Sequence, residues 1–327
     1  MSAKQFVVAL AVVGVVVLLV PEQLYAWTPA THIFLGKSVL AELHQLAPAV
    51  AELLRAFPFD FLYGNIAADS SIAKSYAPVS RHCHHWHVGQ EIYDHAPNDA
   101  LRAFGLGYLA HLSADTVAHN YFVPRQLALT SSTSSVGHAY WEARFEAHLG
   151  DDYAAEAKEI IQLDHTRADD LLDRIISPTI FSVRTNRRLF RGMVHLTQRP
   201  TWQRAFQVAK ERSRWDLTDH DIELHMARSF EFIMELLGDV EPAARLLDPS
   251  GTEPLKLAKQ MRRETLQDSG HHDLDRLHEM AQQHFGLPER PLAFWSKADL
   301  PAPWTVPSNG RKKKKKKATT TPRAAPG

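Results

Sequence analysis

The stretch from Gly105 to His119 places three polar side chains within an apolar run that has the periodicity of a helix. His111, Asp115 and His119 follow one another at intervals of four residues, so a helix with about 100° between residues brings all three onto one narrow face. A polar group that is buried without a partner costs several kcal/mol. These three side chains must therefore be solvated, hydrogen-bonded to one another or bound to a metal ion.

A second pair with the same spacing, His138 and Glu142, follows on another predicted helix, and residues 81–87 form a histidine-rich cluster, Arg-His-Cys-His-His-Trp-His. Imidazole and carboxylate ligands are typical of hydrolytic zinc sites. The single cysteine, Cys83, excludes a thiolate-rich structural site. Any one of these pairs alone is more often a surface hydrogen bond. The whole set favours zinc.

Helical periodicity extends over the body of the chain, from residue 27 to about residue 286, without the sustained alternation that is typical of strands. Asn98 and Thr218 precede helical patterns as N-caps, and Gly238 and Gly286 close two of them. The sequence therefore predicts an all-α fold, a multi-helix bundle with additional C-terminal helices. The predicted helices are 35–56 with a break at Pro48, 99–119, 137–149, 152–176, 185–198, 219–238, 254–268 and 271–285.

Turn-forming residues predict loops at 64–71, 123–137 and 287–310. The first of these loops contains Asp69. A carboxylate on a loop can reach a metal ion or its bound water without disturbing a helix, so Asp69 is a candidate ligand or general base. Taken alone, an aspartate before two serines is more often a helix cap.

Residues 1–26 have the pattern of a secretory signal peptide, with Lys4 ahead of an apolar segment from Phe6 to Val20 and a small residue, Ala26, at the end. The apolar segment has 15 residues, fewer than the roughly 20 that span a bilayer. We therefore expect export to the periplasm or the medium after cleavage near Ala26. N-terminal anchoring in the membrane is the alternative.

Cleavage after Ala26 would give the mature chain a new terminus at Trp27. The α-amine and the carbonyl oxygen of that residue are metal ligands that the precursor lacks, and His32 follows closely enough in sequence to join them. The alternative is that Trp27 and His32 only pack the first helix onto the core.

The C-terminal residues 311–327 hold eight basic residues and no acidic one, although the whole chain has 37 of each kind. The body from 27 to 310 is consequently acidic, with a net charge of −8 when histidine is neutral. A lysine-rich segment of this kind cannot bury enough apolar surface to fold, so we expect a disordered tail. Such a tail can tether a protein to an anionic membrane or polymer, although most such runs are simply solvated.

These features together resemble the zinc-dependent phospholipase C family. The resemblance implies a helical domain over residues 27–286, with its signature part at 27–150, followed by the Pro-rich segment 287–310 and the tail. The order of the polar residues carries the resemblance better than any single motif. The matching positions are Trp27, Thr31-His32, the segment 64–69, the cluster around His85, His111, Asp115, His119, His138 and Glu142.

The resemblance further implies up to three closely spaced zinc ions. By position, the first would be held by His32, Asp115 and the amine and carbonyl of Trp27. The second would use Asp69, His111, the shared Asp115 and one histidine of the 84/85 pair, with His85 preferred and His84 second. The third would be held by His119, His138, Glu142 and water.

The implied activity is zinc-dependent hydrolysis of a phosphodiester bond in a phospholipid, in which Asp69 orients or deprotonates a zinc-bound water. The His-x3-Asp-x3-His pattern at 111–119 is closer to the glycosylphosphatidylinositol-specific phospholipase D branch, so C-type and D-type cleavage both stay open. Two alternatives remain: a single-strand nuclease with a similar site and a non-catalytic exported metal-binding protein. No specific nucleic-acid partner is expected of so acidic a body. The side chains considered for the mouth of the site are Phe57, Phe59, Phe61, Tyr63 and Trp86.

Overall fold

The computed structural model describes residues 27–294 except for short gaps at 73–75, 131–133, 150, 239–241 and 270–272 and an interrupted stretch between 198 and 214. The predicted signal peptide and the predicted lysine-rich tail both lie outside the described residues. Among the helices that are described, none has the length and apolar character needed to cross a bilayer.

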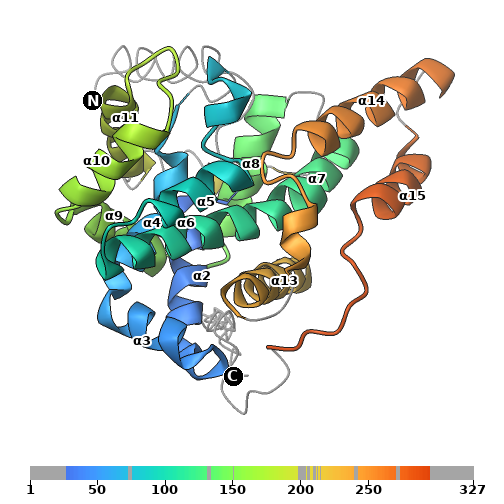
Figure 1. The fold of residues 1–327 in the computed structure, drawn as a ribbon. Coiled ribbons are helices and arrows are strands. Elements are labelled where there is room, and N and C mark those ends of the chain that lie inside the picture. Colours follow the sequence, from blue (N-terminus) through green and yellow to red (C-terminus); the bar gives the residue numbers. More distant parts are fainter. Residues whose placement is uncertain are drawn as a thin grey trace, which may run out of the picture.

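All the regular structure of the described residues is helical, which confirms the predicted all-α fold (Figure 1). Helices α2 to α10 occupy residues 29–175, and several further helices follow them. The α-helices are α2 (Pro29–Ala41), α3 (Pro48–Ala56), α4 (Pro58–Ala67), α5 (Trp86–Asp94), α6 (Asp99–Val117), α7 (Val123–Thr130), α8 (Ser134–Glu146), α9 (Asp151–Gln162), α10 (Thr166–Ile175), α11 (Val183–Thr197), α13 (Asp219–Leu237), α14 (Thr252–Ser269) and α15 (Leu274–Phe285). Short 3-10 helices are η1 (Leu43–Gln45), η2 (Ala68–Ser70), η4 (Val79–Arg81) and η6 (Ala243–Leu246), and η5 (Ala118–Phe122) is a π-helix.

Helix α6 runs through the middle of the body and is buried on nearly all sides (Figure 1). It begins where predicted, because the side chain of Asn98 accepts a hydrogen bond from the backbone N–H of Leu101 and so caps the first turn. A helix that is apolar all round belongs in a core. The polar residues His111 and Asp115 therefore enter the interior together with α6.

Helices α4 and α6 cross at a pair of glycines. A β-carbon at Gly64 would lie 2.1 Å from the carbonyl oxygen of Phe104, and one at Gly107 would lie 2.0 Å from the carbonyl oxygen of Phe61. Only glycine allows two helix backbones to come this close. The crossing holds η2, the continuation of α4, against the middle of α6.

The loops predicted at 64–71 and 123–137 are wrong, because the turn-forming residues in both segments lie largely in helices. Pro58 occupies the first turn of α4, where its missing N–H costs nothing, and the segment from Gly64 to Ala67 is helical. The segment 123–130 likewise forms α7. The predicted single helix at 152–176 is also wrong, since α9 and α10 are separated by a break around Asp164.

The last described segment, residues 286–294, crosses α13 as an extended strap, shown in red in Figure 1. Three buried charged residues of α13 hold it. Arg228 donates to the carbonyl oxygens of Pro288 and Arg290, and the two carboxylate oxygens of Glu231 accept from the backbone N–H groups of Ala293 and Phe294. Glu235 accepts from the side chain of Arg290 at 2.7 Å. Buried charges are tolerated here because each one is hydrogen-bonded.

The close helix crossing yields a stability prediction. We expect Gly107→Ala to lower the free energy of unfolding by about 1–3 kcal/mol or more, because the added methyl forces α4 and α6 apart. Urea denaturation followed by circular dichroism measures this. Gly192→Ala in α11 is the matched control, since a β-carbon there meets nothing within 4 Å, and we expect it to be neutral or stabilising by up to about 1 kcal/mol. Equal effects of the two substitutions would contradict the tight crossing.

Candidate metal centre

Six elements bring imidazoles and carboxylates to one region of the interior. Every one of these side chains is at most 4% exposed. Groups of histidine and acidic side chains close enough to hold a metal ion form in three places within this region. The contributing residues are His32 from α2, Asp69 from η2, His84 from the turn before α5, His111 and Asp115 from α6, His119 from the π-helix η5, and His138 and Glu142 from α8.

Asp115 lies at the centre of the region. Its Oδ1 is 3.2 Å from Nε2 of His32, and its Oδ2 is 3.0 Å from Nε2 of His84 and 3.1 Å from Nε2 of His111. The rings of His32 and His111 are stacked with their centroids 3.9 Å apart. One carboxylate thus faces three imidazoles and has an oxygen directed to each side of the site.

Asp69 on η2 also faces two of these histidines, His84 and His111. Its Oδ1 lies 3.4 Å from Nε2 of His84 and 3.9 Å from Nε2 of His111, and these two nitrogens are 3.2 Å apart. Two carboxylates and two imidazoles therefore direct their donor atoms at one small volume. Nitrogen and oxygen donors in this arrangement form the ligand set of a catalytic zinc site.

The backbone fixes which nitrogen of His111 faces this volume. Nδ1 of His111 lies 2.8 Å from the carbonyl oxygen of Asn65, and a carbonyl can only accept, so Nδ1 carries the proton. In the neutral ring, Nε2 then directs a lone pair at the carboxylate of Asp115. Two lone pairs at 3.1 Å repel each other unless a proton or a cation lies between them. A hydrogen bond from the second ring nitrogen is the usual support of a metal-binding histidine.

The electrostatics of the site favour the protonation states that bind metal. Burial, followed by the neighbouring His111, lowers the pKa of His32 to about 4, so this imidazole is neutral at pH 7. Burial by itself would raise the pKa of Asp115, but when Nε2 of His111 also carries a proton, the positive charge of His111 and hydrogen bonds with His111, His32 and His84 hold the pKa of this carboxyl well below its usual value. Nδ1 of His32 is buried without a hydrogen-bond partner among the described groups. The residues present therefore fit a bound divalent cation.

The third group lies beside the first two. Nε2 of His138 is 2.7 Å from Oε1 of Glu142, one turn further along α8, and the ring centroid of His119 lies 5.3 Å from that of His138. The ring centroids of His119 and His84 are 6.4 Å apart. His119 thus stands between the two parts of the site.

A π-turn interrupts the regular helix that was expected to carry His111, Asp115 and His119 on one face. His111 and Asp115 are neighbours on α6, and His119 lies within the π-helix Ala118–Phe122, where backbone hydrogen bonds span five residues instead of four. His119 groups with His138 and Glu142. Local π-turns occur frequently at functional sites.

The order of preference between the two adjacent histidines is also corrected. His84 is buried against Asp69, His111 and Asp115, whereas His85 is only half-buried and its ring lies against those of His82 and His87. Adjacent residues in a turn point in different directions, so only one of the two can reach the cluster. The pattern of the sequence could not tell which one.

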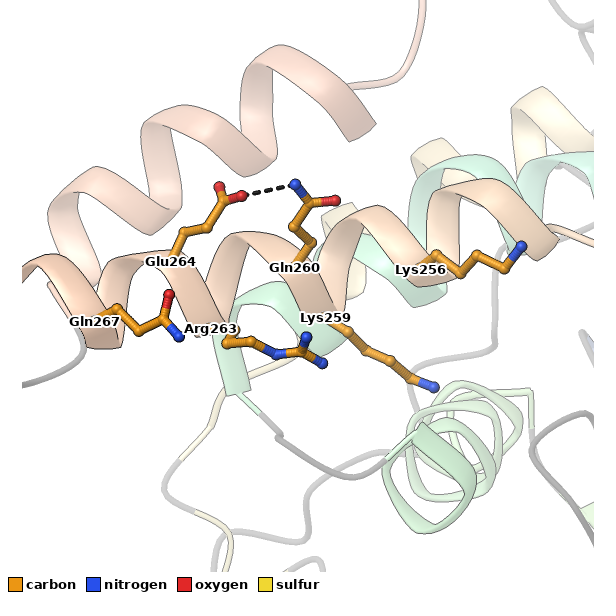
Figure 2. Close-up of a pocket in the computed structure, with 6 residues that line it drawn as sticks. All are labelled: Lys256, Lys259, Gln260, Arg263, Glu264 and Gln267. Carbon is orange, nitrogen blue, oxygen red and sulfur yellow. Dashed lines mark hydrogen bonds between the residues drawn. The ribbon is translucent and has the colours of Figure 1, made fainter.

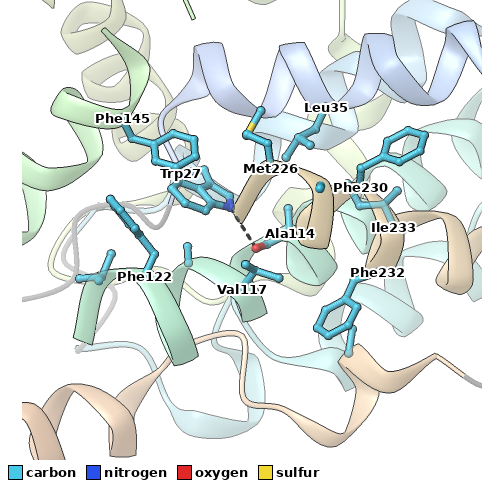
Figure 3. Packing of buried hydrophobic residues seen from close by; sticks show 14 of the residues in the cluster. Trp27, Leu35, Ala114, Val117, Phe122, Phe145, Met226, Phe230, Phe232 and Ile233 are labelled. Carbon is cyan, nitrogen blue, oxygen red and sulfur yellow. Dashed lines mark hydrogen bonds between the residues drawn. The ribbon is translucent and has the colours of Figure 1, made fainter. Parts of the chain in front are cut away.

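Trp27 lies beside the site with its indole ring in the core (Figure 3). The indole N–H donates to the carbonyl oxygen of Ala114 at 3.1 Å, and the ring packs against Phe122 and Phe145. Ala114 immediately precedes Asp115 in α6. The side chain of Trp27 therefore packs in the core, as one of the two alternatives for this residue expected. The indole anchors this end of the chain next to Asp115.

The aromatic residues considered for the mouth of the site differ in burial, and Phe57 is half-buried. Phe61 and Tyr63 belong to the buried core, and Tyr63 stacks on His165 with ring centroids 3.6 Å apart. Phe59 is exposed on α4. Trp86 is half-buried, donates to the carbonyl oxygen of Leu247 and lies under the guanidinium of Arg245.

A surface hollow of about 510 Å³ lies on the exposed face of α14 (Figure 2). It is lined by polar and charged side chains, with one hydrogen bond from Gln260 to Glu264. The hollow shares no residue with the histidine and carboxylate groups. Its lining residues are Lys256, Lys259, Gln260, Arg263, Glu264 and Gln267.

Residues 31–181 match the family model described as zinc dependent phospholipase C. This segment belongs to the zinc-dependent phospholipase C family. The match includes the histidine and carboxylate ligand candidates of α2, η2, α6, η5 and α8, and it confirms the family resemblance of the sequence. No curated protein and no solved structure matches the chain significantly.

The zinc-dependent phospholipase C segment ends well before the helical body does. Helices α11, α13, α14 and α15 follow residue 181. Sequence reasoning missed the groups that orient the ligands, namely the carbonyl of Asn65, the thiol of Cys83 at 3.2 Å from Nδ1 of His84, and the carbonyl of Pro249 beside His119. Backbone carbonyls leave no signal in a sequence. Cys83 was visible, but its partner was not.

The geometry predicts how substitutions change metal content. We expect Glu142→Gln to remove about one zinc ion, and Asp115→Asn to remove more than one, because Asp115 contacts ligands of two groups. Mass spectrometry of the purified, dialysed protein measures bound zinc. The control is Glu156→Gln, whose carboxylate pairs with Lys37 at the surface and should keep the full content. Unchanged zinc in both site variants would contradict the assignment.

Proposed function

We propose that this protein is a zinc-dependent phosphodiesterase that hydrolyses phospholipids at the headgroup. The observation that carries the proposal is the buried carboxylate of Asp115 facing three imidazole nitrogens at 3.0–3.2 Å, within a segment of the zinc-dependent phospholipase C family. A core gains nothing from burying these groups together unless a cation binds there.

The ligand groups assign a set of residues to each ion. His32 and Asp115 would hold one ion together with the amine and carbonyl of Trp27, and Asp69, His84, His111 and Asp115 would hold a second. His119, His138 and Glu142 would hold a third. When bound, zinc supplies Lewis acidity, which lowers the pKa of water towards about 7 and stabilises charge on the phosphoryl oxygens.

The side chains of the chain itself have three tasks in this reaction. Asp115 would serve two ion positions, because its two oxygens face different histidines and one carboxylate can neutralise two adjacent cations. Asp69 orients the attacking water and accepts its proton, since its carboxylate lies at the edge of the group formed by His84 and His111. The apolar packing around Trp27 excludes bulk water from the first ion position.

The proposed first ion position requires export and processing. The amine of Trp27 exists only after cleavage behind Ala26, and the indole hydrogen bond to Ala114 holds Trp27 next to Asp115. We expect N-terminal sequencing of the exported protein to begin at Trp27. We also expect the unprocessed precursor to bind one zinc ion fewer, because the amine ligand is missing. A mature terminus elsewhere would overturn this position while leaving the other two intact.

The activity is tested on lecithin vesicles. We expect release of the phosphorylated headgroup, loss of at least about 100-fold in rate after treatment with a chelator, and recovery on addition of zinc. Asp69→Asn should retain zinc better than it retains activity if Asp69 handles the proton, because the amide can still act as an oxygen ligand.

Two other outcomes would overturn the proposed substrate. Acid-soluble nucleotides released from single-stranded DNA, with lecithin left intact, would identify a nuclease. A protein that holds zinc but is inert on phospholipid, synthetic phosphodiester and nucleic acid would be a metal-binding protein without catalysis. Phosphatidic acid rather than a phosphorylated headgroup would indicate D-type cleavage.

A further inference from the structure

A loop from outside the family segment holds the His119 ligand. Nδ1 of His119 lies 2.5 Å from the carbonyl oxygen of Pro249, and the side chain of the next residue, Asn120, donates to the carbonyl oxygen of Asp248 at 2.9 Å. The loop 248–252 joins η6 to α14, more than 60 residues beyond the end of the family match at 181. The π-helix η5 is therefore tied to the C-terminal helices at the ligand itself.

The carbonyl of Pro249 determines the tautomer of His119. A carbonyl oxygen only accepts hydrogen bonds, so the proton of the neutral ring resides on Nδ1, and Nε2 carries the lone pair. Nε2 is then the nitrogen available to an ion shared with His138 and Glu142. The arrangement matches that of His111, whose Nδ1 donates to the carbonyl of Asn65.

The loop reaches His119 only because residue 251 is glycine. Gly251 has a φ of +61°, the only positive value among the glycines of the described residues, and this left-handed conformation disfavours other side chains. A β-carbon at this position would lie 2.4 Å from Cβ of His119 and 2.9 Å from its carbonyl oxygen. Any larger residue pushes the loop and His119 apart.

The side chain of Asp248 holds the loop in this shape. Its carboxylate accepts hydrogen bonds from the backbone N–H groups of Ser250 and Thr252 and from the hydroxyl of Ser250. These bonds fold residues 248–252 into a compact turn at the start of α14. The turn places the carbonyl of Pro249 over the ring of His119.

We propose that loop 248–252 positions His119, so that the C-terminal helical region completes the metal site of the family segment. Gly251 and Asp248 are positioning residues: they act through His119 and do not touch the ion. The inference rests on the proposed function in one respect, since it requires that the group of His119, His138 and Glu142 bind zinc.

The test is the zinc affinity of Gly251→Ala, measured by competition with a chromophoric chelator. We expect one ion to bind about 10–100-fold more weakly, the usual cost of losing the outer partner of a ligand, and the remaining ions to bind as before. Gly192→Ala is the matched control, because it adds the same methyl group in open space. It should leave zinc binding unchanged.

A double-mutant cycle separates positioning from general destabilisation. Removal of the imidazole in His119→Ala abolishes the third ion position by itself, so adding Gly251→Ala should cost no further zinc affinity if Gly251 acts through His119. A general folding defect would instead add its effect to that of His119→Ala. Asp248→Ala, which creates no clash, is the second variant in case Gly251→Ala folds poorly, and it should weaken the same single ion.

The outcomes distinguish this inference from the proposed function. Wild-type protein that binds no zinc overturns the proposed function. Wild-type protein that binds zinc, together with Gly251→Ala and Asp248→Ala variants that bind it with wild-type affinity, overturns the positioning role alone. Equal loss of all ions in the variants also overturns it.

Discussion

The structure depends on the burial of one carboxylate. Asp115 is fully buried, and an anion in the interior is tolerated only if opposite charge or hydrogen-bond donors surround it. His32, His84 and His111 meet that requirement when a proton or a cation lies between them and the carboxylate, and they come from α2, from the turn before α5 and from α6 itself. The positions of these elements around α6 therefore have to agree to within the length of a hydrogen bond. The close crossing of α4 and α6 at Gly64 and Gly107 helps to fix the position of η2, which directly follows α4.

The site is built from both halves of the chain. The family segment supplies all the histidine and carboxylate ligand candidates, but the loop between η6 and α14 supplies supports, such as the carbonyl of Pro249 beside His119 and the carbonyl of Leu247 beside the indole of Trp86. Polar contacts also hold the strap 286–294, because buried charged side chains of α13 bind its backbone. The C-terminal region is thus more than an appendage in structural terms.

The sequence was informative wherever a single periodicity decided the structure. The all-helical fold, the caps at Asn98 and Thr218 and the grouping of polar residues on α6 follow from spacing alone. The sequence did not reveal in which direction individual side chains point. The choice between His84 and His85 depends on one turn, and the helical state of Pro58–Ala67 depends on burial of apolar residues that a loop prediction ignores. Carbonyl supports such as that of Asn65 are invisible, because every residue carries one.

The π-turn at 118–122 lies where the polar side chains divide into two groups. In a regular helix, His119 would follow Asp115 along one stripe. In this structure His119 instead groups with His138 and Glu142 of α8, whereas Asp115 groups with His32 and His111. The residues at the end of α6 and in the irregular turn after it thus contribute to two neighbouring polar groups, each with partners from another helix.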